Sequence, residues 1–186
     1  MAGSGQWRLH KTVVMVGMMG AGKTAVGRAV AARLGVAFVD SDAEIERAAN
    51  MTITEIFARD GEAFFRDRER LVIGRLLDEE RAILSIGGGA FLCAQTRQII
   101  SGKGVSLWLD ADLDLLWNRV KHKDTRPLLR TSDPFETLAA LYEARVPLYR
   151  LADFRVRADE AYSIDTMAGK VIETLATRAD VLEKCK

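Results

Sequence analysis

Apolar positions along this chain recur in two rhythms, which together predict a protein of alternating strands and helices. In some segments the apolar residues form short continuous runs, which predict strands. In other segments they return every three or four positions, as they do on the buried face of a helix. Strands are expected at 13–16, 36–39, 82–86, 104–110 and 154–157. Helices are expected at 25–34, 43–49, 52–59, 62–78, 94–101, 112–120, 135–143 and 166–182.

Glycine and proline set several of the expected helix ends. Gly35 is expected to stop the first helix, and Asp60-Gly61 to separate the segments on either side of it. The helix that begins at Phe135 is expected to reach Arg145 and to end before Pro147, because proline lacks a backbone N–H donor.

The alternation of strands and helices favours an α/β fold, with a five-stranded parallel sheet that has helices on both faces. A single domain is expected over 12–178, between a disordered tail at 1–11 and a C-terminal tail at 179–186. The charged segment 121–133 has prolines near its edges and reads as a loop. Loops of this length in compact domains are often active-site lids, so a mobile lid is predicted there.

Composition narrows the possible partners. The 186 residues are 48% hydrophobic and 28% charged, with 27 basic against 26 acidic side chains. A nearly neutral chain has no bulk basic field for nucleic acid or an anionic membrane, and no apolar run approaches the roughly 20 residues of a membrane span. Cys93 and Cys185 match no metal or redox spacing, so a reducing, cytoplasmic setting is expected.

The strongest chemical signal is the segment from Gly17 to Thr24, which follows the first strand and matches the phosphate-loop pattern. Its glycines let main-chain N–H groups close around phosphate oxygens. Lys23 can reach the outer phosphates, and the Thr24 hydroxyl can ligate Mg²⁺. The helix that follows would direct its positive N-terminal end at the anion. A nucleotide-phosphate site is therefore predicted.

Polar or glycine-rich residues follow two further strands, at the edge where open α/β sheets bind ligands. Asp42 is favoured as a ligand-binding carboxylate, although Ser41 or Asp42 could simply cap a helix from Ala43. The triple Gly87-Gly88-Gly89 suits either a close approach to a ligand or a flexible turn. For the carboxylate that usually ends a buried strand in phosphate-loop proteins, Asp40 and Asp110 are both candidates.

Arg66 and Glu69 are three positions apart on an expected helix, close enough for the carboxylate to orient the guanidinium. The alternative is a surface ion pair of little energetic value. Because Arg66, Arg68 and Arg70 alternate with Asp67 and Glu69, the local pattern favours the solvated face.

Six motifs occur in an order and spacing that resemble the shikimate kinase family, over nearly all of the chain from Thr12 to Leu175. They are Gly20-Ala21-Gly22-Lys23-Thr24 with Gly27-Arg28, Asp40-Ser41-Asp42, Gly61-Glu62 with Phe65-Arg66 and Glu69, Gly87-Gly88-Gly89, Arg126-Pro127-Leu128-Leu129, and Arg145 with Pro147-Leu148-Tyr149.

The resemblance implies a nucleoside-monophosphate-kinase-like fold and phosphoryl transfer from MgATP to the 3-hydroxyl of shikimate, in aromatic amino-acid synthesis. It implies that shikimate is bound by Asp42, Arg66, Gly88 and Arg145. It implies nucleotide contacts from Gly20, Ala21, Gly22, Lys23, Thr24, Ala25, Arg119 and Arg126. Lys23, Asp42 and Arg126 then resemble the catalytic groups, with Thr24 and Asp40 as Mg²⁺ ligands.

The resemblance also reverses the interpretation of Arg66, from solvated face to substrate ligand. There are three departures: the family often has Ser at the position of Thr24, it often has a hydroxyl residue at the position of Ala25, and the segment after Arg157 matches poorly, so nucleotide contacts are not assigned there. A monomer is expected.

Two other functions remain open. A related small-molecule kinase, such as a gluconate kinase, would use the same scaffold, but Asp42, Arg66 and Arg145 together disfavour it. A non-catalytic nucleotide-binding module could be expected to lack Lys23, Asp42 or Arg126, and the chain has all three. The guanine-reading Asn-Lys-x-Asp element of GTPase switches does not occur.

Overall fold

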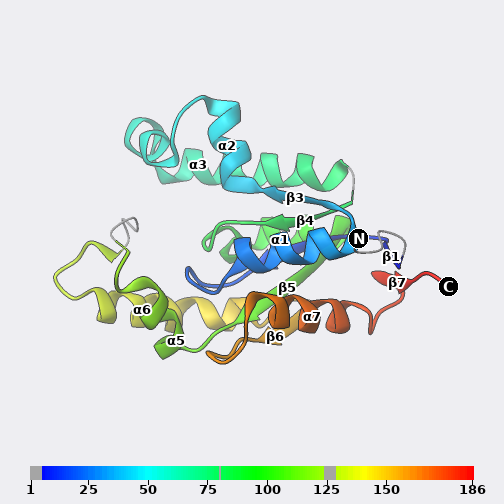
Figure 1. Ribbon diagram of the computed structural model, residues 1–186. Coiled ribbons are helices and arrows are strands. Elements are labelled where there is room, and N and C mark those ends of the chain that lie inside the picture. The colour runs from blue at the N-terminus through cyan, green and yellow to red at the C-terminus, as the bar shows by residue number, and fades with distance from the viewer. Residues whose placement is uncertain (1–5, 80, 124–128) are drawn as a thin grey trace.

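A five-stranded parallel sheet forms the middle of the protein, which confirms the predicted fold class (Figure 1). This computed structural model describes residues 6–79, 81–123 and 129–186. The strand order is β3-β4-β2-β5-β6. The central strand β2 (Thr12–Val16) pairs with β4 (Ala82–Ser85) and β5 (Gly104–Asp110), and β3 (Ala37–Asp40) and β6 (Phe154–Arg157) form the two edges.

The sequence of each strand reflects its place in the sheet. Every residue of β2, β4 and β5 is buried, as expected for parallel strands that are covered on both faces. β6 instead alternates buried and exposed residues, because it lies at an edge.

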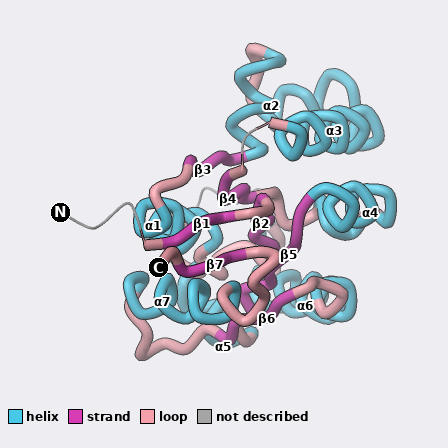
Figure 2. The backbone as a smooth tube through the Cα atoms, turned by 90° about the vertical axis from the view of Figure 1, so that its right-hand side faces the viewer, coloured by secondary structure: helices cyan, strands magenta, loops and turns pink. Residues whose placement is uncertain are grey.

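Helices cover both faces of the sheet. Figure 2 shows α1 (Lys23–Leu34) and α7 (Ile164–Leu175) on one side and α3 (Ile53–Asp78), α4 (Ala94–Lys103) and α6 (Pro134–Tyr149) on the other. The remaining helical elements are α2 (Ser41–Ala49), the 3₁₀ turn η1 (Ala90–Leu92) and α5 (Leu113–Val120). Within the described part of the chain, no helix combines the length and the apolar character needed to cross a membrane.

Two predicted breaks are confirmed, whereas α2 and α6 differ from their predicted bounds. Gly35 ends α1 in the left-handed conformation, and Gly61 interrupts α3 with φ 84°. The helix expected from Ala43 begins at Ser41, because the Asp40 side chain caps it. Pro147 does not end α6 but lies inside it. The last turn persists because Val146 and Tyr149 are buried there.

The prediction of tails at 1–11 and 179–186 is wrong in part. β1 (Trp7–Leu9) pairs antiparallel with β7 (Leu182–Lys184), so the two ends of the chain lie side by side. For the same reason the helix expected to run to residue 182 ends at Leu175. These short strands are too brief for a periodic signal, and each is stabilised by the other.

The sheet register brings the predicted site residues to one edge. Ser85, the last residue of β4, lies beside Asp40 on one side and Met15 on the other. The chain segments that leave β2, β3 and β4 therefore emerge next to one another. These segments carry the phosphate loop, Asp42 and the triple glycine.

Candidate active site

The phosphate loop connects β2 to α1 and ends in an uncapped helix N-terminus. Gly22 precedes α1 with φ 96°, a conformation that favours glycine, and no side chain caps the helix. The first N–H groups of α1 are therefore directed at the loop, which makes an anion site. Lys23 Nζ donates to the carbonyl oxygens of Gly17 at 2.7 Å and Met18 at 3.0 Å. The ammonium is thus held over the loop.

A cavity of about 580 Å³ extends from this loop to the triple glycine. Ten of the predicted site residues line it, namely Gly20, Ala21, Gly22, Lys23, Thr24, Ala25, Asp40, Asp42, Gly88 and Arg119. Nucleotide-phosphate and metal candidates therefore share one hollow with two of the acceptor candidates, Asp42 and Gly88, whereas Arg66 and Arg145 do not line it.

The triple glycine is the point where the acceptor candidates converge. A Cβ atom on Gly87 would lie 3.2 Å from Asp42 Oδ1 and 3.5 Å from Glu69 Oε2. A Cβ on Gly88 would lie 3.0 Å from Arg145 Nη1, and one on Gly89 only 2.8 Å from Arg66 Cζ. Side chains longer than glycine would displace these groups, so the turn is glycine because charged side chains close around it.

The Arg66–Glu69 pair is not a surface ion pair. Arg66 Nη1 donates to Glu69 Oε1 at 2.7 Å, and the Glu69 side chain is only 2% exposed. The second carboxylate oxygen, Oε2, is buried without a hydrogen-bond partner in the described structure. Burial raises the pKa of Glu69 against the opposing charge of Arg66. The buried carboxylate therefore holds the Arg66 guanidinium against the triple glycine, next to the cavity residue Gly88.

The surroundings of Asp42 disfavour its charged form. Burial, reinforced by the charge of Asp40 and opposed by that of Lys23, raises the pKa of Asp42 from 3.8 to about 6. The cap of α2 is Asp40, whose Oδ1 accepts from the backbone N–H groups of Asp42 at 2.9 Å and Ala43 at 3.3 Å. Asp42 is therefore not used as a cap, and its carboxylate lines the cavity.

The choice between Asp40 and Asp110 is decided by their surroundings. Asp110 is 5% exposed and forms an ion pair with Arg155, whose Nε donates to Asp110 Oδ2 at 2.8 Å. Asp110 does not line the cavity, whereas Asp40 and Thr24 both do. Mg²⁺ takes oxygen ligands and keeps several waters and phosphate oxygens, so one carboxylate and one hydroxyl beside a phosphate loop fit it.

Arg119 contacts the phosphate loop itself. Its Nη1 donates to the carbonyl oxygens of Gly20 at 3.1 Å and Ala21 at 3.2 Å. This contact ties α5 to the loop and leaves the guanidinium on the cavity wall. Arg126, the other predicted nucleotide-binding arginine, lies outside the described residues.

Sequence reasoning missed one wall of the cavity. Ala158, Tyr162, Ile164 and Met167 line it from the β6–α7 connection and the start of α7. This is the segment to which the sequence assigned no nucleotide contacts. A signal was present: Ser163 caps α7 by accepting from the Thr166 N–H. Recognition of that cap would have placed the start of α7 before the expected residue 166.

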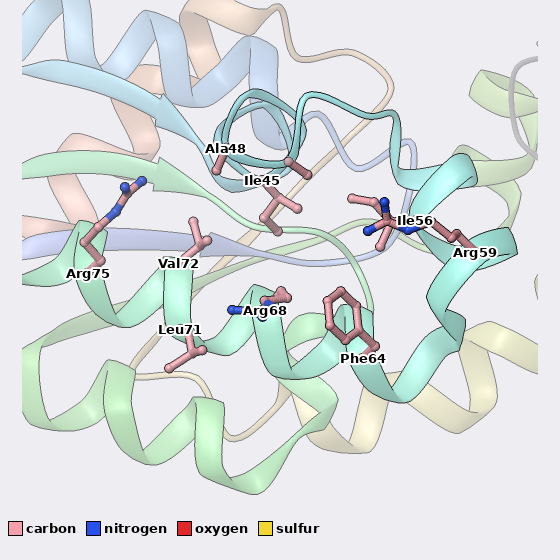
Figure 3. Close-up of a pocket in the computed structure, with 10 residues that line it drawn as sticks. Ile45, Ala48, Ile56, Arg59, Phe64, Arg68, Leu71, Val72 and Arg75 are labelled. Atoms are coloured by element: carbon pink, nitrogen blue, oxygen red, sulfur yellow. The ribbon is translucent and has the colours of Figure 1, made fainter.

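A second hollow, of about 370 Å³, lies between α2 and α3 (Figure 3). Its floor is apolar and includes Ile45, Ile56 and Val72, and arginine side chains stand around it. None of the predicted site residues lines it. The second hollow therefore contributes nothing to the candidate site.

Comparison with known proteins identifies close relatives. The family model described as shikimate kinase matches residues 19–176. A shikimate kinase of Ruegeria pomeroyi is 70% identical over 175 residues, which cover 94% of this chain and 90% of the relative. One from Cereibacter sphaeroides is 62% identical, over 95% of this chain and 88% of the relative.

A solved structure has the same architecture. It is a shikimate kinase from Acinetobacter baumannii in complex with shikimate, which superposes with a TM-score of 0.84 at 36% identity. The match covers 90% of this chain and 93% of that one.

Proposed function

The chain belongs to the shikimate kinase family, and from this premise we propose that it transfers the γ-phosphoryl group of MgATP to the 3-hydroxyl of shikimate. The products are shikimate 3-phosphate and ADP, on the pathway to chorismate and the aromatic amino acids. One observation carries the proposal: Asp42, Arg66 and Arg145, from three different helices, close around Gly87–Gly89 beside the phosphate loop.

We propose that Arg66 and Arg145 bind the carboxylate of the acceptor. A guanidinium is planar and offers paired N–H donors, which match a carboxylate better than a lysine ammonium does. Arg66 is held by buried Glu69, and Arg145 is only 9% exposed. Both are thus fixed before the acceptor arrives, which lowers the entropic cost of binding. Gly88 supplies backbone contacts between them.

Asp42 accepts the proton of the attacking hydroxyl. With a pKa of about 6 the carboxylate is ionised near neutral pH and is still basic enough to take a proton. The hydroxyl oxygen forms a bond to the γ-phosphorus while the bond from that phosphorus to the β,γ-bridging oxygen breaks, and ADP leaves with the electron pair. Lys23 and the loop N–H groups stabilise the charge on the moving phosphoryl group.

Thr24 and Asp40 hold the magnesium ion that accompanies ATP. The ion would supply positive charge that stabilises the transferring phosphoryl group. Arg119 and the wall formed by Ala158 and Tyr162 contact the nucleotide on the side away from the acceptor. Arg126, outside the described residues, has the role that the family resemblance implies, contact with the transferring phosphate.

We further propose that the enzyme acts as a cytoplasmic monomer. The two cysteines, Cys93 and Cys185, are unpaired, which fits a reducing compartment. Light scattering of the purified protein at micromolar concentration should give the mass of one chain, and the mass of a dimer would contradict the monomer.

The test is a coupled assay of ADP formation with shikimate, gluconate and nucleoside monophosphates as competing acceptors. We expect preferential turnover of shikimate, and phosphorus NMR should show one new phosphate monoester on the acceptor. Lys23→Ala, prepared in the same way, serves as the control for contaminating kinases. Preferential turnover of another acceptor overturns the proposal.

A further inference from the structure

Tyr149 is the last residue of α6, and its hydroxyl reaches the triple glycine. The side chain is fully buried, and its hydroxyl donates to the Gly88 carbonyl oxygen at 2.6 Å. Two neighbouring rings fix its plane: Phe91 at 6.5 Å and Trp108 at 6.2 Å between centroids, both stacked. The ring is therefore held in one orientation, with its hydroxyl at the Gly88 carbonyl oxygen.

The same hydroxyl also contacts Arg145. The two residues are four apart on α6 and therefore share one face of the helix. A Cβ on Gly88 would lie 3.0 Å from Arg145 Nη1 and 3.5 Å from the Tyr149 hydroxyl. Burial raises the pKa of Tyr149, and the charge and a hydrogen bond of Arg145 oppose that rise. The hydroxyl thus stays neutral, donates to the Gly88 carbonyl oxygen and lies near the Arg145 guanidinium.

We propose that Tyr149 is a positioning residue for acceptor binding, which holds the Gly88 carbonyl and the Arg145 guanidinium in their binding arrangement. The inference rests on the proposed function, in which Arg145 binds the acceptor carboxylate. Because the peptide after Gly88 is planar and trans, a fixed Gly88 carbonyl also fixes the direction of the Gly89 N–H on its opposite side.

A merely structural tyrosine would not need this hydroxyl. Phenylalanine would fill the same volume between Phe91 and Trp108, so packing alone does not select tyrosine. The helix also continues past Pro147, at the loss of a backbone hydrogen bond, and this last turn is what brings Tyr149 to the site. Without the hydroxyl, the Gly88 carbonyl loses its partner and Arg145 gains freedom to turn away.

The experiment compares Tyr149→Phe with the wild type and with Tyr142→Phe, which removes a hydroxyl from the same helix away from the glycine turn. We expect KM for shikimate to rise about ten-fold in Tyr149→Phe, from the loss of one buried hydrogen-bonded group. KM for ATP and kcat should stay close to the wild-type values, and Tyr142→Phe should leave all three unchanged.

A double variant tests whether Tyr149 acts through Arg145. If it does, Tyr149→Phe adds little to the effect of Arg145→Lys, because both remove the same arrangement. Fully additive effects on KM for shikimate would contradict the inference. Should Tyr149→Phe not fold, Gly88→Ala tests the same contact from the other side, because its methyl group would separate Arg145 and Tyr149. It too should raise KM for shikimate and spare KM for ATP.

Different results would overturn the positioning role of Tyr149 and the proposed kinase function. An unchanged KM for shikimate in Tyr149→Phe, or equal losses for shikimate and ATP, overturns the positioning role while the wild-type enzyme still phosphorylates shikimate. A wild-type enzyme that does not phosphorylate shikimate overturns the proposed function, and this inference with it.

Discussion

Replacement of Asp42 by asparagine should disable the enzyme and yet stabilise its fold. The carboxylate is partly buried and lies near Asp40, and both the burial and the neighbouring charge disfavour its charged form. Asparagine has nearly the same shape and carries no charge, so it removes the cost of an ionised group at this position. It also removes the group that we propose takes the proton of the acceptor hydroxyl.

The size of the effect follows from the pKa of Asp42, which rises from 3.8 to about 6 on folding. Each pKa unit corresponds to about 1.36 kcal/mol, so ionised Asp42 opposes folding by at most about 3 kcal/mol above pH 6. Since the folded state holds this proton more tightly than the unfolded state, the cost falls as the pH drops through 6 and is absent below 3.8. Asparagine should therefore stabilise the fold by about 1–3 kcal/mol at neutral pH.

The assay is urea unfolding of the wild type and Asp42→Asn at about pH 7.5 and again at about pH 5, where part of the difference should already have vanished. Glu143→Gln is the matched control, because it neutralises an exposed carboxylate on α6. We expect this control to change the free energy of unfolding little at either pH. Activity of Asp42→Asn with shikimate should fall by about a hundred-fold or more.

Two results would refute this reasoning. Asp42→Asn that is no more stable than the wild type at neutral pH would show that the ionised carboxylate is not strained by its surroundings. A stability gain that does not shrink as the pH falls would show that the gain comes from packing or hydrogen bonding and not from charge.

Three further variants test other parts of the site. Lys23→Ala should lower kcat by about a hundred-fold or more with an unchanged circular dichroism spectrum, because the ammonium faces the phosphates; near-normal turnover would exclude Lys23 from the transfer step. Arg145→Lys should weaken shikimate binding about ten-fold, measured by calorimetry, and leave ATP binding nearly intact, because a lysine ammonium lacks the paired, planar donors of a guanidinium. Equal losses for the two ligands would contradict the assignment of Arg145 to the acceptor. Gly89→Ala should raise KM for shikimate about ten-fold, because its methyl group collides with Arg66, whereas Gly102→Ala, with open space around it, should not.

The sheet was predictable because its signals are local. Strands such as β5 are continuous buried runs whose bounds, Gly104–Asp110, agree with the prediction. The phosphate loop was predictable for the same reason: its glycines, lysine and threonine are contiguous, and their spacing alone dictates an anion site.

The boundaries that were wrong depend on distant contacts. Proline usually ends a helix, but α6 passes through Pro147 because Tyr149 is anchored among Phe91 and Trp108. The end strands β1 and β7 form only because residues more than a hundred positions apart pair with each other. No window of sequence contains such a pairing.

The same difference between local signals and distant contacts applies to the candidate site. The sequence by itself determined the phosphate loop, the strand ends that carry Asp40 and Asp42, and, through the family motifs, the acceptor candidates. The local pattern alone left Arg66 on a solvated helix face and the triple glycine between a ligand contact and a flexible turn, and only the family motifs favoured ligand roles for both. Only the tertiary structure shows that these groups lie together, because Asp42, Arg66 and Arg145 come from separate helices and meet at Gly87–Gly89. The burial of these side chains, the charges around them and their close approach arise only when the three helices pack together, so no single segment of sequence contains them.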